Sequence, residues 1–449
     1  MHIDQTLQAG NEVSLAKNKK VNWPMVYSWV VCGIGAIFYF YEYLLRVSTS
    51  VMTTGLMTSF HINAGALGNL SAYYYYVYTP MQLFVGVFVD RYGPRRLLTM
   101  AAFSCSIGSY MFASADNIII AEIGRFLVGF GSAFAFVGVL KLATIWLPDR
   151  FFGMVSGMTM ALGMIGGLSG DLLLTRLVDV DGWRLTSYMA AAVGLAITLV
   201  MFLLLRDKPK QELDQPISEL PSLKNTCIEI IKIIRNPQIW IAGAIGCLVY
   251  IPTSAFAELW GPTYFKQAYH LTSDKAAAVV SMIFLGWAIG GPIVGWISDR
   301  IKQRRLPMTV GSVVAAVLIS IVLYVPNVSL PLVYFIFFIF GMFSSAQVLV
   351  FAVGREVSPT SFAGTAISLT NMFVMLGGVV FQPLIGDLLD WRWSGIVSDG
   401  VHFFSTSDFQ VALSVLPIGL LIAVFLTFCL QETHCKLVPE NFTRINKEK

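Results

Sequence analysis

Charge is scarce in this sequence of 449 residues. Asp, Glu, Lys and Arg make up 12% of it, hydrophobic residues make up 56%, and the mean hydropathy is +0.70. Soluble globular chains carry about 25% charged residues, so this composition excludes an ordinary water-soluble protein. The six cysteines show neither a disulfide framework nor the spacing of metal ligands. Neither a nucleotide-binding motif nor a nucleophile–base pair is found, so we expect no cofactor, no metal, no direct use of ATP and no enzyme activity.

Long apolar runs are what the sequence has instead. A membrane-spanning helix needs about 20 apolar residues, and unbroken runs of this length satisfy their backbone in lipid as helices rather than as barrel strands. The pattern therefore predicts an all-α integral membrane protein with twelve spans. The expected spans are 25–50, 66–89, 96–114, 117–146, 151–174, 185–206, 238–263, 275–298, 306–325, 330–354, 362–388 and 410–430.

The basic residues are divided unevenly between the predicted loops. Of the 30 Lys and Arg, 22 lie on the side that carries both termini, five lie on the opposite side and three lie within spans. Loops on the cytoplasmic side of a membrane are enriched in Lys and Arg. We therefore expect both termini to be cytoplasmic in a multi-pass protein of the cell membrane, with the bacterial inner membrane as the expected location. The net charge of +4 is then explained by topology, and nucleic-acid binding is not indicated.

Two copies of one pattern divide the chain into halves. The stretch GVFVDRYGPRR at 86–96 recurs as GWISDRIKQRR at 295–305, and GWR at 182–184 is echoed by DWR at 390–392. Six spans in each half make the halves parallel, related by an axis along the membrane normal. The predicted segments are a cytoplasmic tail 1–24, a first bundle 25–206, a cytoplasmic linker 207–236, a second bundle 237–430 and a cytoplasmic tail 431–449.

The pattern G-x-x-x-D-R-x-G-x-R-R between the second and third spans resembles the signature of the major facilitator superfamily. Its degenerate copy carries Lys302 where the first copy has Gly93, and R-x-x-x-G-x-G from Arg125 resembles the second motif of that family. The resemblance covers the whole chain and implies a secondary transporter. Arg46, late in span one, also resembles the anion-binding arginine of the organic anion symporters in this superfamily, although Leu45 precedes it where that group tends to carry Asp.

The signature residues predict a gate. Glycine at position 86 lets neighbouring helices approach closely, and Asp90 lies at a helix end where it can pair with an arginine and with the N-terminus of a facing helix. Such contacts can form in one conformation and separate in another. Ordinary basic loop charges are the alternative interpretation. The gating candidates are Gly86, Asp90, Arg91, Gly93, Arg95, Arg125, Asp299 and Arg300.

Polar side chains within the spans are the candidates for contact with cargo, because they are costly in lipid. Arg46 can bind a carboxylate or phosphate through two bonds; the alternatives are a pair with Glu42 inside the helix, or snorkelling from a span that ends near residue 50. By the repeat offset, Glu258 maps close to Arg46. The predicted substrate-binding residues are Arg46, Tyr74, Tyr78, Gln82, Glu258, Trp260, Gln347, Asn371 and Gln382.

Three acids within the spans are candidates for carrying a coupling proton. Glu258 comes first, because a carboxyl group buried in apolar surroundings holds a proton readily, and a structural hydrogen-bonding role is its alternative. Glu42 competes with it, and Asp171, expected near the outer surface, ranks below both.

The tyrosines of span two fall into two groups by helical face. Tyr74, Tyr78 and Gln82 share a face that we expect to line the cavity. Tyr73 and Tyr75 are expected in an interfacial aromatic belt.

The favoured function is a secondary active transporter that works by alternating access. We expect proton-coupled uptake of a small organic solute carrying a carboxylate, such as an amino acid, peptide or organic acid. A drug/proton antiporter is one alternative, but the glycine-rich span five, GMTMALGMIGGLSGD, lacks the Gly-Pro usual in such antiporters. A non-transporting membrane sensor is the other, although neither tail is long enough for an output domain. The expected partners are the solute, a coupling ion (a proton) and the lipid bilayer, and the protein is expected to be a monomer.

Overall fold

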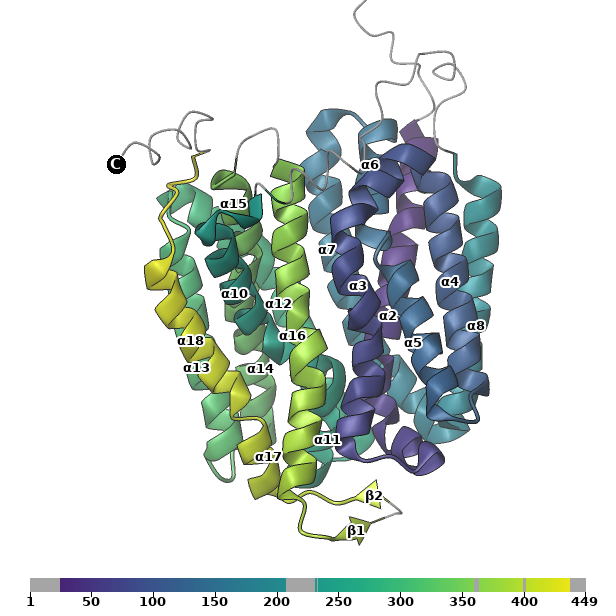
Figure 1. Cartoon of the computed structure of the whole chain (residues 1–449), viewed down its shortest axis with the longest axis vertical. Helices are drawn as coiled ribbons and strands as arrows, with labels where there is room; N and C mark the ends of the chain where they lie inside the picture. The colour runs from purple at the N-terminus through teal and green to yellow at the C-terminus, as the bar shows by residue number, and fades with distance from the viewer. Residues whose placement is uncertain (1–24, 207–230, 232, 359–362, 399–400, 437–449) are drawn as a thin grey trace, which may run out of the picture.

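The computed structural model describes residues 25–206, 231, 233–358, 363–398 and 401–436, and nearly all of these are helical. Figure 1 shows two groups of helices side by side, α2–α8 in one and α10–α18 in the other. The first group consists of α2 (Met25–Phe60), α3 (Ala64–Tyr92), α4 (Pro94–Ser114), α5 (Ile118–Ser132), α6 (Ala135–Trp146), η1 (Asp149–Phe151), α7 (Phe152–Ser169), η2 (Gly170–Leu174) and α8 (Thr175–Leu204).

The second group begins at Pro237 and includes the only two strands among the described residues. Its elements are α10 (Pro237–Ile251), η3 (Pro252–Trp260), α11 (Gly261–Ala268), α12 (Ser273–Ile301), α13 (Arg305–Tyr324), α14 (Leu330–Ser344), η4 (Ser345–Val348), α15 (Leu349–Glu356), α16 (Ala363–Arg392), β1 (Val397–Ser398), β2 (Val401–His402), α17 (Thr406–Ala412) and α18 (Val415–Cys429). The strands pair antiparallel.

Ten helices of the described residues are long and apolar enough to cross a membrane. One of them, Phe152–Leu204, joins predicted spans five and six across Gly182, whose φ of 78° interrupts the helix. Helix α3 is not among the ten, because tyrosines, Asn69 and Gln82 interrupt its apolar residues. The predicted all-α membrane fold is confirmed, and these helices are consistent with twelve spans.

Several spans differ from their predicted form. Helix α2 continues to Phe60, ten residues beyond the predicted end. Predicted span four is divided into α5 and α6, and spans five, seven and ten contain the irregular segments η2, η3 and η4. Segments η2 and η3 are π-helical, a conformation that is rare and is often found at functional sites.

Local residue chemistry explains where the helices begin. The side chain of Asn63 accepts a hydrogen bond from the backbone N–H of Ala66 at the start of α3, and Asn117 and Asn236 cap α5 and α10 in the same way. Pro94 and Pro237 occupy first-turn positions, where no backbone donor is needed.

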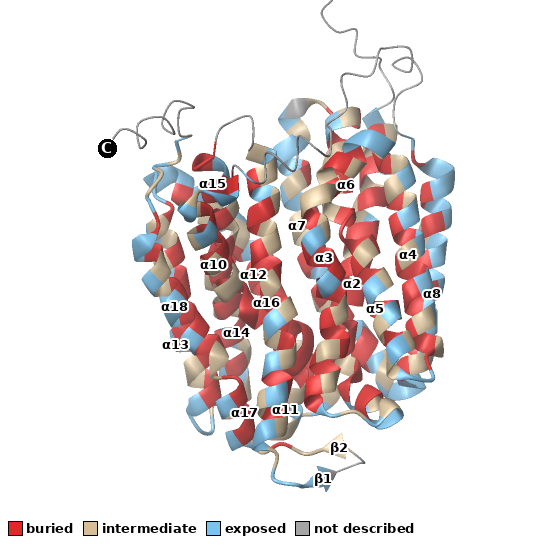
Figure 2. Ribbon diagram, in the orientation of Figure 1, coloured by how far each residue is buried: buried red, intermediate tan, exposed pale blue. Residues whose placement is uncertain are grey.

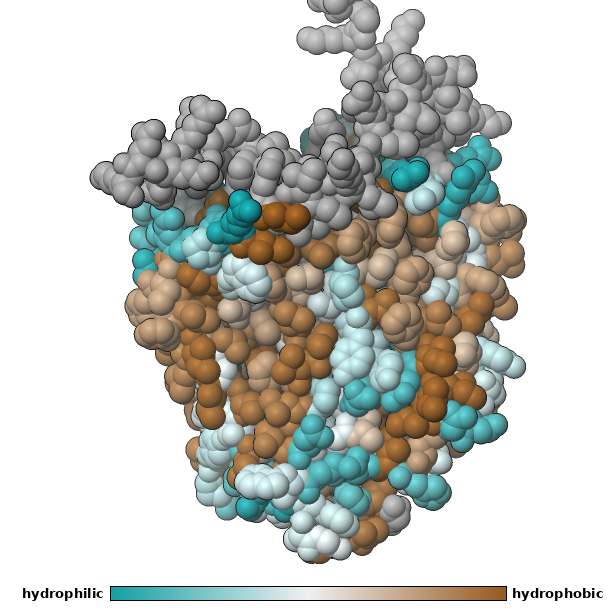
Figure 3. Space-filling view, viewed as in Figure 1, coloured by the Kyte–Doolittle hydropathy of each residue, from teal (hydrophilic) through white to brown (hydrophobic). Residues whose placement is uncertain are grey.

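The surface of the bundle is apolar where a membrane would surround it. Buried residues face the interior of the two groups and exposed residues face outward (Figure 2). On the face seen in Figure 3, hydrophobic side chains cover the middle height of the molecule on both sides of a stripe of more polar residues. Exposed Phe335, Phe425 and Phe428 are 60–66% accessible, which suits contact with lipid and not with water.

The two ends of the bundle are packed differently. We call the end with the loops after α3 and α12 the signature end, and the end with β1 and β2 the hairpin end (Figure 1). At the hairpin end, a Cβ on Gly68 of α3 would lie 2.4 Å from the carbonyl oxygen of Gln382, and a Cβ on Gly386 of α16 would lie 2.3 Å from a backbone oxygen of α3. Close approach of these helices therefore requires glycine at both positions.

Toward the signature end the same helix faces diverge. Gly86 lies five helical turns after Gly68 and so on the same face of α3, yet a Cβ there would meet nothing within 4 Å, and the same is true of Gly364 on α16. Helix α12 follows this pattern, since Phe284 contacts Gly167 of α7 whereas Gly291 is open. The halves are thus in contact from the hairpin end as far as the hydrogen bond between Asn371 and Gln82, and beyond it the facing positions Gly86 and Gly364 are open. The close approach predicted for Gly86 is not made in this conformation.

Candidate functional site

Arg46, Glu42 and Tyr74 form a closed ring of hydrogen bonds in the middle of the bundle. The Arg46 Nη2 donates to both Glu42 carboxylate oxygens at 3.1 and 3.3 Å, and its Nε donates to the Tyr74 hydroxyl at 3.0 Å. The Tyr74 hydroxyl in turn donates to Glu42 Oε2 at 3.0 Å. Arg46 is 2% exposed and α2 continues to Phe60, so the snorkelling interpretation is wrong.

Aromatic rings surround the Arg46 guanidinium. Its central carbon lies 4.2 Å from the ring centroid of Tyr43, 4.9 Å from that of Tyr78 and 5.3 Å from that of Tyr74. Cation–π contacts of this kind gain strength when the cation is removed from water. The structure therefore places predicted Tyr74 and Tyr78 in the buried interior beside Arg46, and adds Tyr43, which the helical-face argument missed.

Arg125 of α5 is a second buried cation behind Tyr74. Its Nη1 donates to the Leu45 carbonyl oxygen at 3.0 Å, and its central carbon lies 5.3 Å from the Tyr74 ring centroid. Its Nε has no hydrogen-bond partner among the described residues. A cavity of about 20 Å³, lined in part by Ser48 and Ser109, lies beside it. Arg125 thus lies near the central cluster and away from the signature loops.

Glu258, in π-helical η3, is the buried acid that the second group of helices contributes to the centre of the bundle. Its carboxylate accepts hydrogen bonds from the hydroxyls of Tyr75 and, at 3.3 Å, Tyr250, and it is fully buried. The aromatic rings of Tyr74 and Tyr75 lie 5.1 Å apart. The two tyrosines therefore connect the hydrogen-bonded cluster around Arg46 to Glu258 in the other half. The acid is therefore held by neutral hydroxyl donors, with no basic residue within salt-bridge distance among the described residues.

The prediction of an interfacial position for Tyr75 is wrong. Tyr75 is 1% exposed, and a Cβ on Gly378 of α16 would lie 2.5 Å from its ring. The sequence carried a usable signal, since Tyr75 lies seven residues from both Gly68 and Gln82, which places all three on the face of α3 that meets α16.

Asp171 is fully buried in the π-helical segment η2. Its Oδ1 accepts a hydrogen bond from the Ser50 hydroxyl at 3.2 Å, and its Oδ2 has no partner among the described residues. Both π-helical segments therefore carry a buried acid, Asp171 in the first half and Glu258 in the second.

The predicted amide side chains are buried or half-buried inside the bundle. Asn371 donates to Gln82 across them at 3.0 Å. The Gln382 side chain donates to the Ser254 carbonyl oxygen at 2.6 Å, and the backbone carbonyl oxygen of Gln382 accepts from the Trp260 indole at 3.0 Å. Gln82 Nε2, Gln347 Nε2 and Gln382 Oε1 are buried without partners in the described part of the chain. An unpaired buried polar atom is costly, so a bound molecule that paired with these atoms would gain affinity.

The first signature loop is held by exposed contacts. Asp90 pairs with Lys141 of α6 at 2.7 Å, with side chains 39% and 37% exposed. Arg95 donates to the Phe202 carbonyl oxygen at 3.1 Å, and Arg91 lies over the Tyr92 ring. Lys141 therefore holds the signature aspartate within its own half.

Both signature loops turn at a residue with positive φ, but the residue type at the turn differs between them. Gly93 has φ 80° and Lys302 has φ 53°. The ψ of Gly93 is 148°, whereas Lys302, with ψ 41°, adopts the left-handed helical conformation, which a non-glycine residue tolerates at a small cost. Replacement of glycine in the second copy is thus accommodated by a different turn.

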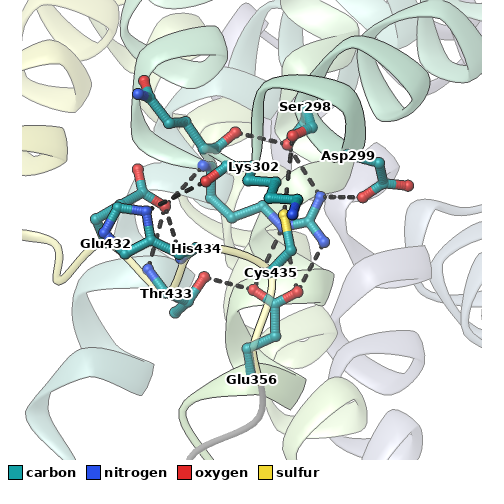
Figure 4. A network of polar contacts seen from close by, with 10 residues as sticks. Ser298, Asp299, Lys302, Glu356, Glu432, Thr433, His434 and Cys435 are labelled. Carbon is teal, nitrogen blue, oxygen red and sulfur yellow. Dashed lines mark hydrogen bonds and ion pairs between the residues drawn. The ribbon is translucent and has the colours of Figure 1, made fainter.

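A buried network holds the second signature loop (Figure 4). Arg304 pairs with Glu356 at 2.7 Å, both side chains 8% exposed, and with Asp299 at 2.7 Å. Glu432, in the segment after α18, accepts hydrogen bonds from the backbone N–H groups of Arg304 and Arg305 at 2.8 and 2.9 Å. Arg300, a predicted gating residue, lies over the Trp296 ring instead.

None of the described residues form a group of three or more His, Cys, Asp or Glu that could hold a metal ion. The acids of the centre are instead partnered by hydroxyl groups and by Arg46. The arrangement supports binding and proton exchange.

Two groups of membrane helices around buried ionisable side chains, closed at one end, define a secondary transporter. A family profile described as Major Facilitator Superfamily matches residues 31–382, and the chain belongs to that superfamily. Its family and fold are those of transporters, which bind small molecules within a membrane.

Individual known proteins resemble the chain over most of its length. The "Probable sulfoacetate transporter SauU" of Cupriavidus necator is 21% identical, over 80% of this chain and 87% of that protein. The "Membrane sensor protein UhpC" of Salmonella typhimurium is 23% identical, over 80% and 84%. A bacterial homologue of the human lysosomal transporter Spinster shares the fold, with a TM-score of 0.72 at 16% identity, over 90% and 97%.

Proposed function

We propose that the protein is a proton-coupled uptake transporter for a small organic solute carrying a carboxylate, and that it works by alternating access. The observation that carries this proposal is the closed set of hydrogen bonds that joins Arg46, Glu42 and Tyr74. A buried guanidinium faces an acid of its own helix, Glu42, and that is its one ion pair among the described residues. A carboxylate ligand can replace Glu42 as the partner, because the planar guanidinium accommodates a carboxylate through two hydrogen bonds.

Coupling to a proton follows from charge balance at the buried site. An anion that enters this site adds a negative charge to a region from which water is excluded, and a proton taken up by a neighbouring acid offsets that charge. We assign the proton to Glu258, with Glu42 as the next candidate and Asp171 as the third. Glu258 lies in the opposite half from Arg46, so substrate and proton would bring the halves together.

Alternating access is supported by the unequal packing of the two ends. The halves touch at Gly68 and Gly386 and are apart at Gly86 and Gly364. The signature end carries most of the basic residues, so we propose that it faces the cytoplasm. The conformation described here is then open to the inside, in a monomer within a bacterial inner membrane.

Two alternatives have different support. A membrane sensor is favoured by the similarity to UhpC, which is named as a membrane sensor protein. A drug antiporter has no such support, and α7 has no proline. The similarity to SauU, named for an anionic compound, favours the anion transporter.

The test of the anion site compares Arg46→Lys and Arg46→Ala with the native protein. A thermal-shift screen of small carboxylates and their neutral amides identifies a ligand, and calorimetry then measures its affinity. Loss of a charge-assisted pair in a desolvated site costs about 2–5 kcal/mol, or roughly 30- to several-thousand-fold in affinity. Both variants should bind poorly, since an ammonium does not reproduce the planar fork of the guanidinium.

Arg184→Lys is the matched control. Arg184 donates to the backbone carbonyl oxygens of Ala113 and Ala115, far along the chain from Arg46, and we expect native affinity in that variant. Near-native binding by Arg46→Ala would contradict an anion site at Arg46. Tight binding without accumulation of the ligand in proteoliposomes would favour the sensor.

A further inference from the structure

Asp390, near the C-terminal end of α16, joins the two halves at the hairpin end. Its carboxylate accepts a hydrogen bond from the backbone N–H of Ala64 at 3.1 Å and another from that of Gly65 at 2.7 Å, both in the first turn of α3. The N-terminus of a helix attracts negative charge through its free N–H groups and its dipole. A charged side chain of the second half is thus bound to a helix end of the first.

Asp390 does more than complete the cap of α3. The side chain of Asn63 already caps this helix from within its own half by accepting from Ala66. Asp390 takes the two N–H groups that remain, and it does so from a residue more than 320 positions away in the chain. The contact therefore depends on how the halves are arranged.

Helices α3 and α16 are antiparallel and carry an aspartate near each C-terminal end. Helix α3 runs from the hairpin end to the signature end and α16 runs back (Figure 1). Asp390 lies against the start of α3, whereas Asp90, at the end of α3, is paired with Lys141 of its own half. One aspartate is engaged across the halves at the closed end, and the other is held within its half at the end where the facing helices diverge.

We propose that Asp390 is a gating residue that holds the hairpin end closed. When the halves separate there, its carboxylate leaves the N-terminus of α3, and closure at the signature end lets Asp90 take up the equivalent position at the start of α16. The two contacts alternate, and each stabilises one of the two end states. This proposal rests on the proposed transport cycle and adds to it a residue that the signature pattern does not contain.

The surroundings of Asp390 allow it to be released. A hollow of about 510 Å³, lined by His61, Asn63, Val401 and His402 among others, opens beside the start of α3. His402 stacks on Trp393 with ring centroids 3.6 Å apart, and its Nδ1 lies 3.3 Å from Asp390 Oδ1. Water in this hollow can solvate both the carboxylate and the two N–H groups once they part, so opening leaves no buried charge unpaired.

Hydrogen exchange, measured by mass spectrometry on the full-length protein without solute, tests the proposal. In Asp390→Asn, amides in the first turn of α3 should exchange about tenfold faster, because a charge-assisted contact is lost. At the same time, amides around Gly86 and Gly291 at the signature end should exchange at least about threefold more slowly, because the population shifts toward the state closed there. A structural cap would produce the first effect without the second.

Asp116→Asn is the matched control. Asp116 lies in the loop between α4 and α5, at the hairpin end of the first half, and is exposed. The same charge change there should leave exchange at both ends as in the native protein. In Asp90→Asn/Asp390→Asn both contacts are removed, and protection at the signature end should return toward the native level.

Faster exchange confined to the first turn of α3 in Asp390→Asn would overturn the gating role. Unchanged exchange in a folded Asp390→Asn protein, with folding checked by size exclusion, would do the same. Because no solute is present, these outcomes are independent of whether the carboxylate site at Arg46 is correct.

Discussion

The two signature loops of this protein share a sequence pattern but differ in how firmly they are held. The first loop has one ion pair, Asp90–Lys141, between side chains that are more than one-third exposed. The second has Arg304 paired with Glu356, both nearly buried. Exposed pairs contribute little and are easily broken, whereas breaking a buried pair is strongly destabilising. The two halves thus share a sequence pattern, but only the contacts of the first loop are weak enough to be broken easily.

The same division appears in the centre of the bundle. The first half supplies Arg46, Arg125 and Glu42, and the second supplies Glu258. Arg46 is bound to an acid of its own helix, whereas Glu258 is bound to neutral tyrosine hydroxyls. We infer that the first half provides the charge that attracts the substrate and the second provides the acid that takes up the proton.

Glu258→Gln should have the largest effect, because it removes the proton site and leaves the shape of the centre. We expect accumulation driven by a pH gradient to be abolished in proteoliposomes, while counterflow exchange of the solute persists. Glu122→Gln, which changes a half-buried acid of α5 outside the central cluster, is the control and should retain coupling. Accumulation in the Glu258→Gln protein would show that the coupling proton binds at another acid, and Glu42→Gln would be tested next.

Much of the architecture was predictable because lipid imposes simple rules on sequence. Span length, the repeat and the signature predicted the membrane bundle, and the superfamily is confirmed. Arg46 was identifiable as a site candidate because a charged residue within a membrane span is costly and therefore indicates a function. These arguments depend on local sequence alone.

The contacts between distant segments were not predictable. Tyr75 meets Glu258, Glu432 meets Arg304, and Asp390 meets the start of α3, all across more than 120 residues. The π-helical segments add a second difficulty, because each changes the rotation per residue and so invalidates a helical face extrapolated at 3.6 residues per turn.

Removing Glu356 should have the largest effect on stability. Glu356→Ala leaves Arg304 nearly buried without its main partner, and breaking such a pair typically costs about 3–5 kcal/mol. We expect a clear fall in the midpoint of thermal unfolding in detergent. Asp299→Asn is the control, since the Asp299 side chain is 67% exposed and its loss should change stability little. Equal midpoints in the two variants would show that the network of Figure 4 does not anchor the loop.

Glu432→Gln should have an intermediate and pH-dependent effect. Partial burial raises the pKa of Glu432, but hydrogen bonds from the backbone of Arg304, Arg305 and His434 outweigh it and hold the pKa below its usual 4.5. The ionised group therefore stabilises the folded state above about pH 4.5, and this contribution is lost as pH falls through the lowered pKa.

Loss of a charged cap from helix α13 costs about 1 kcal/mol. Native protein and Glu432→Gln should differ in unfolding midpoint at pH 7 and converge in acid. A difference that does not change with pH would mean that Glu432 acts through packing.

The smallest effect on stability is expected from Lys141→Met, which removes the partner of Asp90. An exposed pair contributes about 0–1 kcal/mol, so the unfolding midpoint should stay close to the native value. Transport should nevertheless change, since Asp90 is then no longer held within its own half and is free to contact α16 at the signature end. The closed state at that end becomes more populated, and amides near Gly86 should gain protection from hydrogen exchange.

Asp90→Asn should slow transport while leaving stability intact, because it removes the contact itself. Native transport rates in well-folded Asp90→Asn protein would show that the first loop, although the more easily rearranged of the two, takes no part in gating.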